Sequence, residues 1–266
     1  MKKILLIVLA LGLVTGCSTA KNNEQNNTEN ISELSLTDEN VVKIINDFRI
    51  DYKIAEGVDI YNYINQELTD SDIVQLAFVN SKGSVKIEKD CDSENNLYND
   101  DNGTLYSCEY LTYSDLNKNY NSLTGKDLLK SSISFNDSLV KFLYDDVEDM
   151  FRILYVAGGG GEEYYHISKL EKAEKQNEYI YIYEKIIFVS PDYENGGFIL
   201  IKPSDVANNV LNAGVEIGEY AYDENNPSAR FDKMIEDHID KFETFKWSFK
   251  LNSNGEYVYD SLTLVK

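Results

Sequence analysis

The run EYIYIYEKIIFV at residues 178–189 constrains the fold of this chain more than any other stretch. It is rich in isoleucine and tyrosine and contains neither proline nor glycine, which is typical of a β-strand. The run EYYHISKL at residues 163–170 precedes it across the polar segment EKAEKQN at residues 171–177. We interpret that segment as a turn, so the two runs predict consecutive strands of an antiparallel sheet.

Strand-like segments also occupy much of the middle and the end of the chain. They lie at residues 84–89, 104–113, 198–203, 244–251 and 256–265. The glycines of NGG at residues 195–197 indicate a turn, and the sequence NSNG between the last two segments indicates a terminal hairpin.

Helical patterns lie before, between and after these strands. Thr37 is the predicted N-cap of a first helix, and Thr69 with Asp72 predicts a capping box at a second. Residues 114–125 fit a short helix that a glycine ends, and residues 228–242 fit an amphipathic helix. This order predicts the α+β class: an antiparallel meandering sheet with N-terminal helices and a late amphipathic helix packed on it.

Two segments fit more than one conformation. Residues 58–68 suit a helix or a strand. Apolar residues at 137–157 recur at helical spacing, and a helix there would make the glycines at 158–161 its C-cap. Four acidic residues in the middle of the segment and its β-rich end favour the other interpretation, a hairpin that turns at Asp145–Asp149.

The first 16 residues are organised like a secretory signal peptide. Two lysines precede an apolar run at residues 4–14, which is shorter than the roughly 20 residues that a membrane-spanning helix needs. Val-Thr-Gly-Cys at residues 14–17 then resembles the lipobox of bacterial lipoproteins. That resemblance implies cleavage before Cys17 and acylation of its thiol, and two acyl chains are sufficient for stable anchoring to a membrane.

Cys17 is followed by a polar, asparagine-rich stretch without apolar periodicity. We therefore expect residues 17–34 to comprise the lipidated cysteine and a disordered tether. Residues 35–266 are enough for one large domain or two small ones. We predict a single extracytoplasmic α+β domain, with an internal boundary near residues 125–135 as the alternative.

Several stretches together resemble the uncharacterised lipoproteins of low-GC Gram-positive bacteria. They are the lipobox, the segment SDLNKNYNSLTGKDLL, the glycine run before ISKLEKAEKQNEYIYIYEK, and the ending FKWSFKLNSNGEYVYDSLTLV. The resemblance implies membrane anchoring and the fold class, and it implies no particular activity.

The formal net charge of −21 limits the partners of the chain. Such a charge repels nucleic acids and anionic lipid headgroups, so we expect neither as a partner. We interpret the acidic residues as a solvated surface. The 20 tyrosines could stack on sugars or peptides, but strand composition accounts for them without a ligand.

Cys91 and Cys108 remain as a pair in an exported domain once Cys17 is acylated, and this invites a disulfide. The expected geometry leaves the pairing open. A tight turn at Asp100–Gly103 would set the two cysteines out of register. A looser loop over residues 92–103 would allow their Cα atoms to approach within the about 7 Å that a bridge requires.

The most site-like string is VAGGGGEEYYHISK at residues 156–169. A phosphate cradle needs glycines followed by a helix, whereas here a strand-like run that opens with two carboxylates follows the glycines. We therefore expect a chain reversal at this position. Glu162, Glu163 and His166 are nevertheless the candidate residues for an acid–base site.

Residues 98–109 partly resemble an EF-hand loop, with Asp100, Asn102 and Glu109 at ligand positions. Tyr98 stands where the first aspartate is needed, and the flanks are strand-like, so we expect a turn without a metal. The chain contains neither HExxH nor GxSxG. We expect no catalytic residues, no metal and no cofactor.

These observations predict a lipid-anchored, acidic lipoprotein on the extracytoplasmic face of the cell membrane. We expect a non-catalytic binding or structural module of the cell envelope, whose ligand or protein partner the sequence does not identify. The alternative is a cell-wall hydrolase, or a modulator of cell-wall enzymes, with an acidic site beside the glycine-rich loop.

Overall fold

The computed structural model describes residues 31–51, 60–87, 97–99, 105–107, 109–134, 140–155, 165–210, 213–226 and 228–266. The helices within these ranges are α1 (Glu39–Phe48), α2 (Ile60–Asn65), α3 (Asp70–Ser81), α4 (Tyr113–Thr124), α5 (Pro203–Ala207) and α6 (Ala229–His238). Short 3₁₀ helices follow α3 at Lys82–Ser84 and α6 at Ile239–Lys241. None of the helices in the described ranges is long and apolar enough to cross a bilayer.

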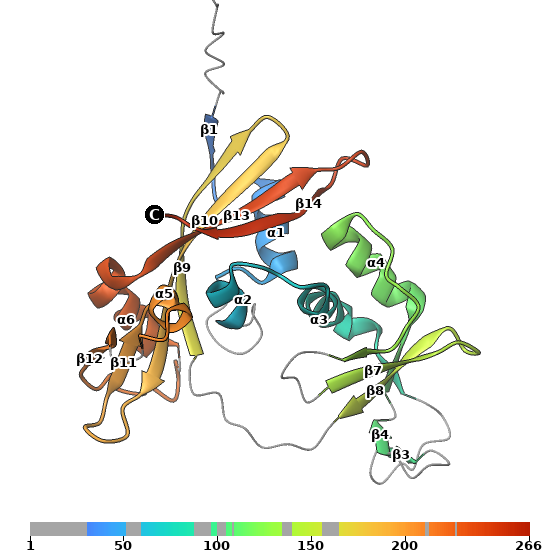
Figure 1. Cartoon of the computed structure of the whole chain (residues 1–266), viewed down its shortest axis with the longest axis horizontal. Helices are drawn as coiled ribbons and strands as arrows, with labels where there is room; N and C mark the ends of the chain where they lie inside the picture. Colours follow the sequence, from blue (N-terminus) through green and yellow to red (C-terminus); the bar gives the residue numbers. More distant parts are fainter. Residues whose placement is uncertain are drawn as a thin grey trace, which may run out of the picture.

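The described strands form two antiparallel sheets and one small hairpin (Figure 1). Sheet A contains β1 (Ile31–Leu34), β9 (Tyr165–Gln176), β10 (Tyr179–Pro191), β11 (Phe198–Ile201), β12 (Val215–Ile217), β13 (Glu243–Leu251) and β14 (Tyr257–Leu264). Sheet B contains β2 (Lys86–Ile87), β5 (Glu109–Thr112), β6 (Ile133–Ser134), β7 (Val140–Asp145) and β8 (Met150–Tyr155), and β3 (Leu97–Asn99) pairs with β4 (Leu105–Ser107). The predicted α+β class with a meandering antiparallel sheet is confirmed.

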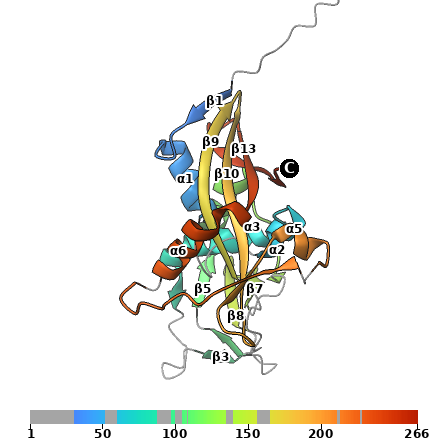
Figure 2. The ribbon, with the colours of Figure 1, turned by 90° about the vertical axis from the view of Figure 1, so that its left-hand side faces the viewer.

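Sheet A is organised around β10, which pairs along one edge with β9. Its other edge is divided between β13, over residues 179–186, and β11, over residues 188–191. β14 then pairs with β13, and β12 pairs with β11. Figure 2 shows β9, β10 and β13 as one long upright layer. A single strand therefore connects every part of this sheet.

The alternating half of β10 has one buried face. Ile180 and Ile182 are buried in the main core beside Trp247 and Phe249 of β13, while the tyrosines between them point to the other face. The same core continues through α1, α3 and α4 to Phe151 and its neighbours in sheet B. α3 and α4 thus lie between the two sheets (Figure 1).

The second half of β10 is apolar without alternation, and its residues are buried on both faces. Ile187 and Val189 point away from the main core into a second apolar cluster. α6 covers this cluster with Phe231, Met234 and Ile235. The predicted packing of the late amphipathic helix on the sheet is therefore present.

The tyrosines of the alternating half pack against their neighbours on the outer face of sheet A. The rings of Tyr179 and Tyr181 stack at 5.8 Å with an angle of 7° between their planes. The ammonium groups of Lys250 and Lys246 lie 5.6 and 4.8 Å from the centres of these two rings. Neighbouring side chains therefore cover part of the faces of these two rings.

The interpretation of residues 171–177 as a turn was wrong. β9 continues to Gln176, which pairs with Tyr179, and the chain reverses at Asn177, whose φ of 55° asparagine tolerates well. Ala173 is fully buried, and Lys172 forms an ion pair with Glu174. Polar side chains on an exposed face do not prevent backbone pairing, so polarity alone was a poor sign of a turn.

The boundary of the predicted tether was also misplaced. Residues 31–34 form β1, which pairs with residues 173–176 of β9. Three of the four side chains of β1 are exposed, so the strand is held by backbone hydrogen bonds without an apolar pattern. The described domain therefore begins at Ile31, inside the segment that we had assigned to the tether.

The ambiguous segments have definite conformations. Residues 60–65 form α2, and the hairpin interpretation of residues 137–157 is confirmed by the pairing of β7 with β8. The backbone amides of Val147 and Glu148 donate to Asp145 Oδ1 in the turn, which explains its acidic sequence. The alternative boundary near residues 125–135 falls inside sheet B, since β5 precedes it and β8 follows it.

The predicted N-cap is confirmed at α3 and was wrong at α1. Thr69 accepts a hydrogen bond from the Asp72 backbone amide, and Asp72 accepts one from the Thr69 amide, which completes the capping box of α3. At α1 the N-cap is Asp38, and Thr37 contacts Ser35 instead. α4 ends at Gly125 (φ 69°), as predicted.

We expect Thr69→Ala to lower the free energy of unfolding by about 1 kcal/mol, because it removes the side-chain half of a capping box. Thr37→Ala is the matched control, since the Thr37 hydroxyl accepts from no amide of α1, and it should cost less than about 0.5 kcal/mol. Urea unfolding measures both values. Equal losses in the two variants would contradict the assignment of the caps.

Candidate functional site

Most of the residues that the sequence singled out lie outside the described ranges. This holds for Cys17, Cys91, Cys108, Glu162 and Glu163, so acylation, the disulfide and the acidic part of the candidate site stay predictions.

His166 is described, and it lies on β9 with its side chain packed inside the molecule. Only 7% of the residue is exposed, and its ring centre lies 5.5 Å from that of Tyr63. Its packing is that of a core residue of sheet A.

The EF-hand-like segment has strands at its ends. Tyr98 belongs to β3 and Glu109 to β5, while Asp100 and Asn102 lie outside the described ranges. No group of histidine, cysteine, aspartate or glutamate side chains within the described ranges is arranged to hold a metal ion.

Glu184 is a charged residue that sequence reasoning did not identify, in the middle of the main core. It is fully buried on the inner face of β10. Trp247 Nε1 donates to its Oε2 at 2.9 Å, the Tyr63 hydroxyl donates to the same oxygen at 3.1 Å, and the backbone amide of Asp51 donates to Oε1 at 2.8 Å. These donors join the end of α1, α2 and β13 to β10.

Burial raises the pKa of the Glu184 carboxyl above its ordinary value, and the hydrogen bonds from Trp247 and the Asp51 amide oppose the rise. The Ser168 hydroxyl also favours the ionised form of this carboxyl, although its oxygen makes no hydrogen bond of ordinary geometry. A perturbed carboxyl can mark an active site. Here every donor is part of the core framework, so we assign Glu184 a structural role.

An acidic hollow of about 490 Å³ lies next to this network, between α6 and β9. Its lining consists of Asp51, Ser168, Lys169, Asp232, Ile235, Glu236 and Ile239. The single lysine offsets part of the negative charge of three carboxylates. An acidic cluster of this kind is common on acidic proteins, and the buried Ser168 hydroxyl of this lining acts on the Glu184 carboxyl, so the described lining is accounted for without a ligand.

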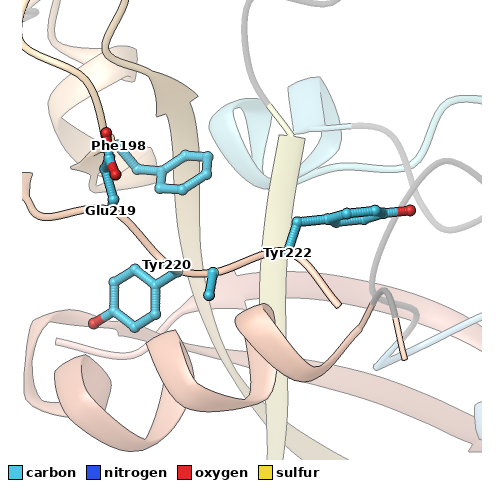
Figure 3. A pocket seen from close by; sticks show the side chains of 6 residues that line it. Phe198, Glu219, Tyr220 and Tyr222 are labelled. Atoms are coloured by element: carbon cyan, nitrogen blue, oxygen red, sulfur yellow. The ribbon is translucent and has the colours of Figure 1, made fainter. Parts of the chain in front are cut away.

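A second hollow of about 450 Å³ has three aromatic residues in its lining. It lies between the start of β11 and the segment that follows β12, and it is lined by Gly197, Phe198, Glu219, Tyr220, Ala221 and Tyr222. We call it the aromatic hollow. Figure 3 shows Tyr220 and Tyr222 extending in opposite directions from the same segment.

The close approach of β11 and β12 requires glycine at residue 197. Gly197 has φ 88°, and a Cβ there would lie 2.5 Å from the carbonyl oxygen of Ile217. Tyr220 fastens the following segment to the end of α6, because its hydroxyl donates to Asp237 Oδ2 at 3.1 Å and lies 2.9 Å from His238 Nε2. The walls of the aromatic hollow are thus fixed at both ends.

Arg230, in the first turn of α6, packs against Phe198 and Tyr222, two residues of the aromatic hollow. Its guanidinium carbon lies 4.6 Å from the ring centre of Phe231, 5.4 Å from that of Tyr222 and 5.8 Å from that of Phe198. Its Nε is buried and has no hydrogen-bond partner, and it forms no ion pair with a carboxylate of the described residues. A buried donor left without a partner costs about 1–3 kcal/mol.

Tyr165 is the second unsatisfied donor of this cluster. Its ring meets that of Phe231 edge-on at 5.4 Å, and its buried hydroxyl has no hydrogen-bond partner. Burial raises the pKa of Tyr165 to about 12, while the positive charge of Arg230 acts in the opposite direction. The hydroxyl therefore stays protonated at neutral pH and can donate.

The aromatic hollow is chemically suited to holding a ligand. Among the described residues of its lining there is no histidine, cysteine, serine or threonine that could form a nucleophile–base pair. Two of its aromatic residues, Phe198 and Tyr222, also contact the Arg230 guanidinium, and aromatic surface next to a cation is suited to binding.

Comparison with known proteins finds no family model, curated protein or solved structure that matches the chain. The function must therefore be inferred from the arrangement of its own side chains.

Sequence signals for Glu184 and Arg230 were present but faint. Glu184 follows Ile180 and Ile182 at the same spacing of two, which places a glutamate on the face that the isoleucines bury. Arg230 is one of three arginines, and it directly precedes an apolar residue of the amphipathic helix. Neither pattern shows which side chains from distant segments pack around them.

We expect Glu184→Gln to change the pH dependence of stability. A carboxyl whose folded pKa is raised makes wild-type stability fall as pH rises from the unfolded value through the folded one. Glutamine does not titrate, so the free energy of unfolding of the variant minus that of the wild type should increase over this window, by about 1.4 kcal/mol for each unit of pKa elevation. Urea unfolding between mildly acidic and neutral pH measures this difference, and a constant difference would contradict the raised pKa.

Proposed function

We propose that this chain is a lipid-anchored binding module on the extracytoplasmic face of the cell membrane. The lipobox-like residues that end at Cys17 support the anchoring, because only a cysteine thiol can carry the thioether-linked lipid at this position. The aromatic hollow supports the binding function.

The observation that carries the binding function is the position of Arg230 among aromatic rings without an ion-pair partner in the described residues. Desolvating a guanidinium and leaving a donor unsatisfied lowers the stability of the free protein. A ligand that accepts a hydrogen bond from this donor and pairs with the charge would recover the lost free energy. A volume of about 450 Å³ is within the range of small-molecule sites.

The net negative charge of the chain limits the partners that we expect. With 46 acidic and 25 basic side chains, we expect a partner that is neither a nucleic acid nor an anionic lipid surface. The hydrolase alternative remains a prediction, since Glu162 and Glu163 lie outside the described ranges.

We expect Cys17→Ala to abolish incorporation of labelled palmitate and to release the protein into the medium, because no thiol is left to acylate. Cys91→Ala is the matched control and should keep both the label and the membrane fraction. Retention of the label by Cys17→Ala would contradict the anchor.

We also expect small fragments of the cell wall, muropeptides or glycans, to raise the Tm of the wild-type protein. A ligand at about a hundred times its Kd stabilises by about 2.7 kcal/mol, which a thermal-shift assay detects. Tyr222→Ala should reduce this rise, because Tyr222 lines the aromatic hollow and is 59% exposed in the ligand-free protein. Tyr179→Ala, which removes a tyrosine from the outer face of sheet A, should retain it.

The absence of any ligand-induced rise in the wild type would contradict the binding function. An undiminished rise in Tyr222→Ala would contradict the assignment of the site.

A further inference from the structure

We propose that the aromatic hollow binds a singly charged carboxylate attached to an apolar or planar body, and that Arg230 is the residue that holds the carboxylate. This inference rests on the proposed binding function and specifies the chemistry of its ligand.

The first argument is the fixed orientation of the guanidinium. The ring centres of Phe231, Tyr222 and Phe198 lie 4.6, 5.4 and 5.8 Å from its central carbon, so three rings restrict the movement of the group. The hydrogen-bonding N–H groups of arginine lie in its plane, where a carboxylate can accept two of them in parallel. A guanidinium that packing already orients loses little further freedom when it binds.

The second argument is the pair of unsatisfied donors. Arg230 Nε and the Tyr165 hydroxyl are both buried without a partner, and both belong to the cluster around Phe231. A carboxylate accepts several hydrogen bonds and donates none. It is therefore complementary to two groups that can each donate a hydrogen bond and have no acceptor.

The third argument is the charge of the surroundings. Lys233, one turn further along α6, is paired with Asp237 at 3.3 Å, whereas Arg230 has no such partner among the described residues. The net charge of −21 and the nearby Glu219 act against multiply charged anions. These charges favour a carboxylate over a phosphate.

The body of the ligand follows from the walls. Phe198, Tyr220 and Tyr222 offer aromatic surface, and aromatic side chains pack well on apolar groups, planar groups and sugar rings. A carboxylate of this description is found at the C-terminus of a short peptide and on an acidic sugar. The experiment must distinguish these two sources.

Two matched pairs of probes separate the charge from the body. The peptide pair is N-acetyl-Phe-Ala and its C-terminal amide, and the sugar pair is methyl glucuronoside and methyl glucoside. We expect the carboxylate member of at least one pair to bind about tenfold or more tightly than its neutral partner, because hydrogen bonds to charged groups are roughly twice as strong as neutral ones. Whichever pair responds identifies the source.

The direct measurement is the ¹H–¹⁵N signal of the Arg230 Nε–H group in the full-length protein. The chain has three arginines, so loss of one signal in Arg230→Lys assigns it. A bound carboxylate should shift this signal, whereas a ligand that binds elsewhere should leave it unchanged.

Three variants test the role of the side chain. Arg230→Met keeps a long apolar stem against the rings but removes the charge, and it should weaken carboxylate binding about tenfold to a hundredfold. Arg230→Lys keeps the charge without the planar fork and should lose less affinity. Lys233→Met removes a cation from the same helix outside the cluster and should bind like the wild type. Circular dichroism shows whether each variant folds. If Arg230→Met does not fold, the affinity of Arg230→Lys for the carboxylate tests the role of the side chain.

Equal binding of the charged and neutral members of both probe pairs would overturn the inference. An Nε–H signal that does not shift when the carboxylate binds would also overturn it, and so would wild-type affinity for the carboxylate in both Arg230→Lys and Arg230→Met. Binding that depends on Tyr222 but not on Arg230 would overturn it while leaving the proposed binding function intact. If neither pair binds, the carboxylate inference fails, and the muropeptide and glycan screen alone then decides the binding function.

Discussion

The backbone pairing of β10 is the interaction on which the rest of the described fold depends. Its two edges carry β9, β13 and β11, so the terminal hairpin and the strands near the aromatic hollow are joined through one element. The change within β10 from alternating to continuous apolar residues determines where each face is covered. One face supports the main core along most of the strand, and the other is buried only where α6 packs on it.

The elements that could be predicted from the sequence are those whose burial and turn chemistry are local. β10, the hairpin of β13 with β14, and α3 with its capping box belong to this group. β1 and the second half of β9 do not, because their backbone bonds are made to distant segments while their side chains stay largely exposed. Intrinsic patterns report side-chain burial, and an edge strand needs little of it.

The candidate site was even harder to predict from the sequence than the edge strands. The glycine-rich string contains carboxylates and a histidine, which are residue types that can act as acids and bases. His166, the one described member of this predicted set, is nevertheless a core residue. Arg230 and Tyr165 have ordinary neighbours in sequence. Arg230 becomes distinctive only through its contacts with Phe198 and Tyr222, and Tyr165 only through its contact with Phe231. Such a cluster exists only after the chain is folded, so spacing could not reveal it.

β1 determines at which end of sheet A the N-terminal segment enters the domain. β1 pairs beside the hairpin turn at one end of sheet A, and β11, β12 and α6 lie toward the other end (Figures 1 and 2). The 13 residues of β10 span about 40 Å at roughly 3.3 Å per residue. If Cys17 anchors the chain, the anchored segment enters the domain at the end of sheet A that lies away from the aromatic hollow. The acyl anchor and a ligand in the aromatic hollow would then be attached at opposite ends of the same sheet, and neither would obstruct the other.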